Sequence, residues 1–395
     1  MNGTIYMPVG EACSSISDTY REKKNMVTLI NTSDVLEGRV LNHERVPNSN
    51  LKGQFKKTFQ RDDILYSEIR PQNRRFAYVD FSPIDYIAST KLMVIRAKKD
   101  VVSPKYLYYF LKNTSTVAEL QLLAETRSGT FPQITFSEVA NLTIPVPSLA
   151  VQEVIVQTMQ CLEDKITCNE QINDNLQQQA AALFESWFVN YDPWDGVQPS
   201  EWENAPLGSF VEIKRGGSPR PIQDFLSDSG LRWLKISDVT SLSSPFVLEI
   251  KEHIKEEGLR KTVFLHAGEL VLSNSATPGI PKILDVDTCI HDGWLYFPKS
   301  ELSKYYLYLF FKHIRKELVA LGNGSVFTNL KTDILKAFPA TKADESTLKE
   351  FDALVTPLFD AMLNADRENF KLATMRDALL PKLMSSEIDV SEVEL

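Results

Sequence analysis

The stretch PSLAVQEVIVQTMQCLEDKITCNEQINDNLQQQAAALFESWFV, residues 147–189, contains no glycine and no proline after its first residue. Its apolar side chains recur mostly three or four positions apart, or at multiples of that spacing, which is the period of an α-helix with one buried stripe. At 1.5 Å per residue, about 40 helical residues make a rod on the order of 60 Å long, which is longer than most globular domains need. The stretch therefore predicts one long spacer helix over residues 149–189.

A second apolar pattern of the same kind runs from Leu348 to Leu383, with Asn369 and Arg376 as its polar members. It predicts a second long helix over residues 346–385, followed by an acidic tail at 386–395. Either stripe alone would expose roughly ten side chains, at roughly 1.5 to 3 kcal/mol for each large one, so we expect the two helices to pack antiparallel. The alternative is two independent core helices. The expected interface residues are Ile155, Leu162, Ile166, Leu176, Leu183, Phe351, Leu358, Met362, Leu372 and Leu379.

The composition indicates a soluble chain of two domains plus connecting helices. The chain has 395 residues, of which 43% are hydrophobic, so it can build real cores. The N-terminus lacks a cationic region followed by an apolar run, and no run of 18 apolar residues occurs. The four cysteines fit neither a disulfide framework nor a metal-ligand set. We expect a cytoplasmic protein with no membrane partner.

The net charge of −9 is concentrated in the predicted helices and the tail. Residues 149–189 carry −5 and residues 341–395 carry −6, whereas residues 1–148 carry +4 and residues 190–340 only −2. The globular segments can therefore still present basic faces, and the net charge does not exclude DNA as a partner.

The two halves of the chain resemble each other at a spacing of about 200 residues, which indicates an internal duplication. The matching segments keep the same order in both halves. They pair 9–10 with 207–208, 33–35 with 237–239, 63–67 with 269–273, 106–111 with 306–311, 129–134 with 325–330, and 144–145 with 338–339.

Each half mixes short strand-like and helix-like segments, which predicts an α+β fold. The strands are expected at 76–81, 87–95, 232–236 and 269–273, where β-branched or aromatic residues are bounded by turn residues. Helices are expected at 104–112 and 304–321. The predicted domains are 1–148 and 190–345, each followed by its long helix.

Three regions carry a resemblance to a known family. The run IPVPSLAVQ at 144–152 with the helix that follows, and the run ALFESWFVNYDPW at 182–194, resemble the central region of the specificity subunits of Type I restriction-modification systems, called HsdS. The segments KRGGSPR at 214–220, WLKISD at 233–238 and GNGSVF at 322–327 resemble the second target-recognition domain of that family.

The resemblance implies a non-catalytic subunit that binds double-stranded DNA. Each domain would read one half of a split, asymmetric site, and the two helices would set the unread spacer and dock two methyltransferase (HsdM-type) subunits. No cofactor is expected on this chain. S-adenosylmethionine would lie on the partner methyltransferase, and ATP and Mg would lie on a restriction or translocase (HsdR-type) subunit where one is present.

Base reading favours Arg or Lys for guanine and Asn or Gln for adenine. In the first half the candidate DNA-binding residues are Lys52, Lys56, Lys57, Arg61, Arg70, Arg74, Arg75, Arg127, Thr130 and Gln133. In the second half they are Lys214, Arg215, Gly216, Gly217, Ser218, Arg220, Lys235, Asn274, Ser275, Asn323 and Ser325. Glycines among them would let backbone N–H groups approach phosphate. The alternative interpretation is solvated surface charges and turn glycines.

Two other functions stay open on the sequence alone. Asp63 and Glu68 with Arg70 resemble a loose nuclease carboxylate cluster, so a sequence-specific nuclease is the alternative enzyme. A helical scaffold that reads no DNA is the other alternative. The chain lacks a phosphate-binding loop of the Gly-x-x-x-x-Gly-Lys-Ser/Thr type, and its five histidines show no metal-ligand spacing, so no metal site is expected.

Overall fold

The structure is a computed structural model that describes residues 4–49, 53–126, 132–322, 330–385 and 387–390. The chain separates into two compact units. Unit 1 comprises Met1–Asp164 and Leu372–Leu395, and unit 2 comprises Lys165–Lys371. Each unit therefore contains a globular part and a portion of both long helices.

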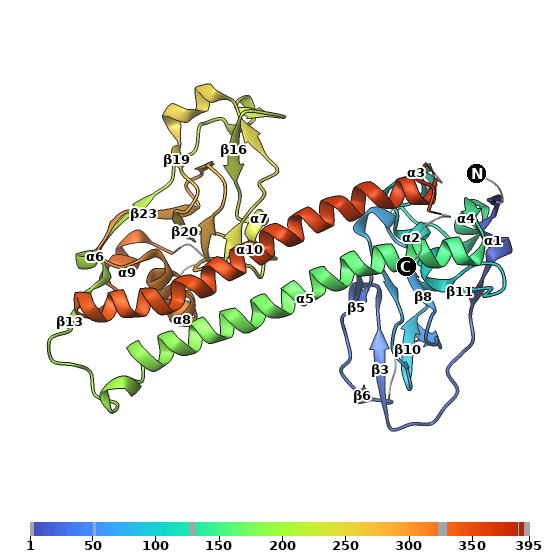
Figure 1. The fold of residues 1–395 in the computed structure, drawn as a ribbon, viewed down its shortest axis with the longest axis horizontal. Coiled ribbons are helices and arrows are strands. Elements are labelled where there is room, and N and C mark those ends of the chain that lie inside the picture. Colours follow the sequence, from blue (N-terminus) through green and yellow to red (C-terminus); the bar gives the residue numbers. More distant parts are fainter. Residues whose placement is uncertain (1–3, 50–52, 127–131, 323–329, 386, 391–395) are drawn as a thin grey trace. The chain divides into compact units, whose positions relative to one another are not determined.

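The two predicted long helices are present as α5 (Leu149–Phe188) and α10 (Glu345–Met384), each of 40 residues (Figure 1). Asp344 caps the start of α10, because its Oδ1 accepts hydrogen bonds from the backbone N–H groups of Ser346 (3.0 Å) and Thr347 (3.1 Å). The hydroxyls of Ser346 and Thr347 also donate to the Asp344 carboxylate. These hydroxyl bonds, and then the backbone ones, hold the pKa of Asp344 well below its usual range.

The globular part of unit 1 is an α+β fold. Its helices are α1 (Val9–Ala12), α2 (Pro104–Lys112), α3 (Thr114–Thr126) and α4 (Phe136–Asn141). Its strands are β1 (Ile5–Pro8), β2 (Cys13–Ile16), β3 (Met26–Ile30), β4 (Val35–Leu36), β5 (Arg39–Val40), β6 (Val46–Pro47), β7 (Phe55–Lys57), β8 (Ile64–Ser67), β9 (Phe76–Tyr78), β10 (Tyr86–Ser89), β11 (Leu92–Ala97) and β12 (Thr143–Val146). They form sheets of order β2-β11-β8-β9 and β6-β3-β10-β7, with the pairs β1-β12 and β4-β5.

Unit 2 repeats this plan. Its helices besides the long ones are α6 (Leu207–Phe210), α7 (Ser237–Thr240), α8 (Lys304–Gly322) and α9 (Thr332–Ala337). Its strands are β13 (Glu203–Pro206), β14 (Val211–Arg215), β15 (Leu226–Ser227), β16 (Leu231–Leu234), β17 (Phe246–Val247), β18 (His253–Ile254), β19 (Val263–Leu265), β20 (Leu270–Ser273), β21 (Pro281–Leu284), β22 (Thr288–Ile290), β23 (Trp294–Ser300) and β24 (Pro339–Lys342). The sheets have the orders β14-β23-β20-β21-β17 and β15-β18-β16-β22-β19, with the pair β13-β24.

The duplication seen in the sequence is also a duplication of topology. In unit 1, β10 pairs parallel with β3 and antiparallel with β7; in unit 2, β22 pairs parallel with β16 and antiparallel with β19. The ribbon β1-β12 leads into α5 just as the ribbon β13-β24 leads into α10. The predicted α+β class, the two copies and the two long helices are therefore confirmed.

One predicted strand is wrong. Residues 87–95 do not form a single strand, because the chain turns at Thr90 and Lys91 between β10 and β11. The two strands belong to different sheets: β10 lies between β3 and β7, and β11 between β2 and β8. The sequence did not indicate this turn, because the strands on both sides of it are buried and apolar.

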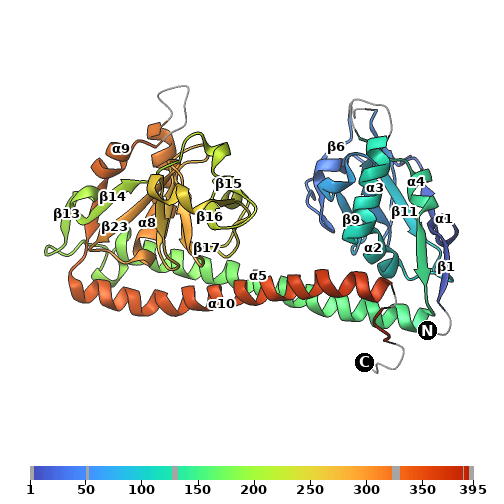
Figure 2. The same cartoon turned by 90° about the horizontal axis from the view of Figure 1, so that it is seen from above.

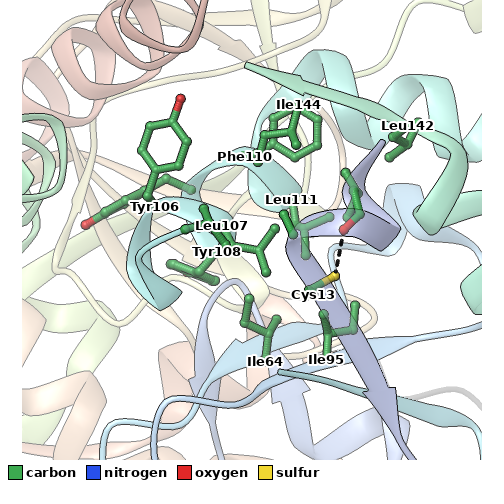
Figure 3. Packing of buried hydrophobic residues seen from close by; sticks show 14 of the residues in the cluster. Cys13, Ile64, Ile95, Tyr106, Leu107, Tyr108, Phe110, Leu111, Leu142 and Ile144 are labelled. Carbon is green, nitrogen blue, oxygen red and sulfur yellow. Dashed lines mark hydrogen bonds between the residues drawn. The ribbon is translucent and has the colours of Figure 1, made fainter. Parts of the chain in front are cut away.

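The core of unit 1 lies between α2 and the sheet that contains β8 and β11. Figure 3 shows Ile64 of β8 and Ile95 of β11 facing Leu107 and Leu111 of α2, with the thiol of Cys13 donating to the carbonyl of Val9 at 3.2 Å. In Figure 2, α2 lies against this sheet, where it contacts β9 and β11. Burial raises the pKa of the Cys13 thiol to about 12, so this cysteine is a packing residue.

In each unit an equivalent tyrosine donates its hydroxyl to the strand that leads into a long helix. In unit 1 the buried Tyr106 of α2 donates its hydroxyl to the carbonyl of Pro145 at 2.7 Å, just before α5. In unit 2 Tyr306 of α8 donates to the carbonyl of Thr341 at 2.8 Å, just before α10. Among the helices of the described residues, none is long and apolar enough to cross a membrane.

Candidate nucleic-acid interface

Several predicted residues of the second half meet at the turn between β22 and β23. Ser218 donates its hydroxyl to Asp292 Oδ1 at 2.7 Å, and Arg220 Nη2 donates to Asp292 Oδ2 at 3.1 Å. Arg215 Nε donates to the backbone carbonyl of Asp292, and the Asn274 amide donates to the same carbonyl at 3.4 Å. We name these residues, Arg215, Ser218, Arg220, Asn274 and Asp292, the Asp292 cluster.

The Asp292 cluster presents its two arginines to solvent. The side chain of Arg220 is 75% exposed and that of Arg215 is 51% exposed. Burial by itself would raise the pKa of Asp292, but the hydrogen bond from Ser218 and the charges of Arg220 and Arg215 hold that pKa below its usual value. An ionised Asp292 therefore orients two exposed guanidinium groups beside a buried amide.

Asp292 and its neighbour His291 were not among the predicted residues. The available signal was Asp292-Gly293, a dipeptide typical of a tight turn between two strands. His291 is structural here, since its Nδ1 accepts from the N–H of Gly293 at 2.8 Å and burial lowers its pKa. Ser275 lies beside the same turn, because a side chain added at Gly293 would meet the Ser275 hydroxyl.

Gly216 and Gly217 lie too close to neighbouring backbone for a side chain to fit. A Cβ at Gly216 would approach the carbonyl oxygen of His291 to 2.3 Å, and one at Gly217 would approach that of Lys261 to 2.9 Å. Their N–H groups donate to the carbonyls of Trp294 (2.9 Å) and Ile290 (3.3 Å). Both N–H groups are thus engaged within the protein and are not presented to a phosphate.

The other two predicted cations of unit 2 lie outside the cluster. Lys214 pairs with Glu212 at 2.9 Å, and Lys235 pairs with Glu252. Asn323 and Ser325 lie outside the described residues. Leu330, which follows them, donates its N–H to the carbonyl of Asn274 at 2.7 Å.

In unit 1, Arg74 and Arg75 have different partners within the protein. Arg74 donates to the carbonyl of Lys112 at 3.3 Å and lies 3.5 Å from Glu37. Arg75 donates to the carbonyl of Ser33 at 2.9 Å. Arg70 is exposed and its N–H donates to the carbonyl of Pro132 at 3.1 Å.

The remaining candidates of unit 1 fall into three groups. Gln133 accepts from the amine of Lys91 at 3.4 Å, and Lys57 donates to the carbonyls of Thr90 (3.1 Å) and Leu92 (2.8 Å), so both have internal partners. Lys56 and Arg61 are exposed. Lys52, Arg127 and Thr130 lie outside the described residues.

Asp63 is not available for the metal site that the nuclease alternative requires. Asp63 is fully buried, and its two oxygens accept from Arg96 Nε and Nη2 at 2.7 Å each. Glu68 instead pairs with Lys91 at 3.3 Å. Across the described part of the chain, no group of three His, Cys, Asp or Glu side chains is arranged to hold a metal ion.

The long helices run antiparallel within each unit. In unit 2 the ring of Phe188, at the end of α5, lies 4.8 Å from that of Phe351, near the start of α10. In unit 1 Ile155 of α5 shares a buried cluster with Leu380 and Leu383 of α10. Of the predicted interface residues, Ile155, Phe351 and Met362 are buried, and the following are half-buried: Leu162, Ile166, Leu176, Leu183, Leu358, Leu372 and Leu379.

Both halves of the chain match the model of one known family. The model of the Type I restriction modification DNA specificity domain matches residues 13–178 and 199–341, which is more than half of the chain. The chain belongs to this family. It is a specificity subunit with DNA-recognition domains, and this role is non-catalytic. The role implies DNA and methyltransferase partners. Nothing favours the nuclease or the scaffold alternative.

Individual relatives agree with this assignment. The Type I restriction enzyme HindI specificity subunit of Haemophilus influenzae is 29% identical, over 92% of this chain and 94% of its own. The MjaIX specificity subunit of Methanocaldococcus jannaschii is 26% identical, over 79% of this chain and 77% of its own. The solved S subunit of a Type I restriction-modification system from M. genitalium shares the fold, with a TM-score of 0.58 at 15% identity over 99% of this chain and 98% of that chain.

Proposed function

We propose that residues 1–148 and 190–345 each read one half of a split, asymmetric DNA site, and that the helices at 149–189 and 346–385 set the unread spacer. The observation that carries this proposal is the duplicated fold with different groups at equivalent positions. Glu68 follows β8 and accepts at its carbonyl from the N–H of Ile134, and Asn274 follows β20 and accepts from the N–H of Leu330. Different side chains therefore stand at one place of the duplicated fold, which supports two copies that present different groups to DNA.

The Asp292 cluster is the proposed reader in the second domain. Arg220 and Arg215 are exposed, and Arg is the usual partner of the guanine edge. In the free chain Asp292 orients both guanidinium groups, which reduces the conformational entropy lost on binding. On DNA, the guanidinium of Arg220 contacts a guanine edge while Asp292 continues to hold it from behind.

In the first domain the proposed contacts come from the exposed cations Lys56, Arg61 and Arg70, with Arg127, Thr130 and Gln133. Arg74 and Arg75 donate to backbone carbonyls of the protein, so their contribution is to hold the surface that carries Arg70. Each guanidinium keeps further N–H donors, so Arg74 and Arg75 can also contact a phosphate without losing these hydrogen bonds.

The proposed complex contains two methyltransferase subunits, which carry S-adenosylmethionine and methylate adenine at N6. Restriction or translocase subunits that use ATP and Mg join it where they are encoded. The acidic helices are the proposed docking elements for the methyltransferases. The chain itself supplies recognition in the cytoplasm and no reacting group.

The experiment compares Arg220→Ala with Lys316→Ala, which removes an exposed cation from α8, in the complex with its methyltransferase. We expect Arg220→Ala to lose about 1 to 3 kcal/mol of cognate affinity and to relax the methylated motif at a position in one half only. Lys316→Ala should change neither. Equal losses on cognate and scrambled duplexes for Arg220→Ala would contradict base reading by this residue.

A further inference from the structure

The contact between α5 and α10 in unit 2 changes from apolar to polar along its length. At one end, rings of α5 such as Phe184 and Phe188 lie within 6.3 Å of the ring of Phe351 in α10. Further along, the buried residues of α5 are Asn169 and Asn173, which are 2% and 5% exposed. Two buried amides in a helix contact are unusual unless each finds specific partners.

Asn169 is held by two side chains of α10. Its amide donates to Glu368 Oε2 at 2.7 Å and to Asn369 Oδ1 at 2.9 Å. Asn369 in turn donates its amide to the carbonyl of Ile166 in α5 at 3.3 Å. The two asparagines therefore connect the helices in both directions.

Asn173 connects both helices to the globular part of unit 2. Its amide donates to Asp366 Oδ1 at 2.7 Å and to the carbonyl of Met362 at 3.3 Å. The other oxygen of Asp366 accepts from the hydroxyl of Ser244, in the segment between α7 and β17. The carbonyl of Ser244 accepts from the buried amine of Lys282 on β21. One carboxylate thus joins α5, α10 and the second globular domain.

Apolar and polar contacts differ in how they respond to a shift of one helix along the other. Phenylalanine, valine and methionine side chains can repack after a shift of one turn, because apolar contacts are not directional. A buried amide cannot, because its donors then face side chains that do not accept hydrogen bonds. Single polar residues in helix pairs are known to specify register for this reason.

We infer that Asn169, Asn173, Asp366 and Asn369, here named the seam network, fix the register of α5 against α10, and that these residues are determinants of spacer length. The inference rests on the proposed function of the helices. One helical turn is about 5.4 Å, which corresponds to one or two base pairs of DNA at about 3.4 Å each. A slip of one turn therefore changes the number of unread base pairs.

The structural test measures register directly. Spin labels are placed at Gln178→Cys on α5 and Glu350→Cys on α10, two exposed positions, in a chain with Cys161→Ser and Cys168→Ser; the remaining cysteines, Cys13 and Cys289, are buried. We expect one narrow distance distribution for this chain. Adding Asn169→Leu and Asn173→Leu should broaden it or add a population displaced by about 5 Å. Asn175→Leu, the same change at an exposed position, should leave it unchanged. An unchanged distribution in the paired variant overturns the inference.

The functional test sequences methylated adenines in cells that express the chain with its methyltransferase. The unaltered chain should give one spacer length, and the paired leucine variant should also methylate sites whose spacer differs by one or two base pairs. If the unaltered chain gives no split motif, the proposed function fails. If it gives one and the paired variant keeps the same single spacer, only the register inference fails.

A reciprocal exchange covers the case in which the leucine variant does not fold. Asn173→Asp alone opposes a second carboxylate to Asp366 and should disturb the register. Adding Asp366→Asn restores the hydrogen bond between the two positions with donor and acceptor exchanged, and leaves only the bond to the Met362 carbonyl unmade. The exchanged variant should therefore be closer than Asn173→Asp to the single spacer and the narrow distance distribution. A complex that is equally disturbed by the single and the exchanged variants overturns the inference.

Discussion

Asp63 occupies a position that has a structural counterpart in the second copy. Its Oδ2 accepts from the N–H of Gln60 at 2.8 Å, and Glu269 accepts from the N–H of His266 at 2.5 Å, three residues earlier in each case. Both carboxylates close the turn that precedes the central strand, β8 or β20. The resemblance of Asp63 to a nuclease carboxylate arose because a turn-closing acid and a metal-binding acid are identical in sequence.

Replacing Asp63 by asparagine should therefore cost stability and no catalytic activity. The change leaves Arg96 without its carboxylate, and breaking such a pair costs about 2 to 4 kcal/mol here, less than for a fully buried pair because Arg96 is 31% exposed. Urea unfolding of the full chain measures the loss. Glu68→Gln, which breaks the more exposed pair with Lys91, should cost less than about 1 kcal/mol. An unaltered unfolding free energy for Asp63→Asn would contradict this role.

Lys282 predicts a pH dependence of stability. Burial, then the charge of Lys312, lowers its pKa from 10.5 to about 8, although Asp366 acts in the opposite direction. Between these two values the unfolded chain binds more protons at this site than the folded chain, so the unfolding free energy rises with pH there, by roughly 1 to 3 kcal/mol in total. Below pH 8 the contribution is constant.

The measurement is urea unfolding of the natural chain and of Lys282→Met between about pH 7.5 and 9.5. Comparing the two removes the contributions of tyrosines and cysteines that titrate nearby. The natural chain should gain stability relative to Lys282→Met as the pH rises through this window. Parallel curves would show that the amine keeps an ordinary pKa in the folded state.

At the scale of single residues, the sequence identifies candidates better than it identifies their partners. Arg215, Ser218 and Arg220 were predicted from one short segment, but Asp292, which orients them, lies more than seventy residues further on. The contrast between Arg220 and Arg74 could not be foreseen, since the conformation of a turn decides whether an arginine reaches solvent or a backbone carbonyl.

At the scale of elements, the long helices were the most predictable part of the fold. Their apolar spacing extends over many turns, and Asp344 supplies a cap that a short window of sequence already contains. Strand boundaries were less predictable, as the turn at Thr90 and Lys91 shows. Two short strands buried in different sheets have the same apolar composition as one longer strand.

Leu176→Glu tests the helix contact at this scale. Leu176 is half-buried and packs against the core of unit 2. A glutamate there loses apolar burial and its carboxylate is partly desolvated, and the two effects together should lower the free energy of unfolding by about 2 to 4 kcal/mol. We expect lower stability and weaker co-purification with the methyltransferase. Gln178→Glu, at an exposed position of α5, is the matched control. Normal stability and normal partner binding of Leu176→Glu would contradict the packed-helix account.

At the scale of the whole molecule, the order of matching segments predicted the duplication, and the strand orders confirm it. The sequence alone does not give the DNA sequence that each copy reads. That depends on the reach of the side chains that contact DNA and on the shape and deformability of the DNA. Equivalent positions such as Glu68 and Asn274 show that the two copies of one fold carry different side chains.

The most direct test of the central claim is sequencing of methylated adenines in cells that express this chain with its methyltransferase, with and without replacement of residues 1–148 by the same segment of another family member. The account predicts a split motif in which only one half changes on replacement, so that the retained half belongs to residues 190–345. Absence of methylation with the natural chain would contradict the account. So would a methylated motif in which neither half changes after the replacement.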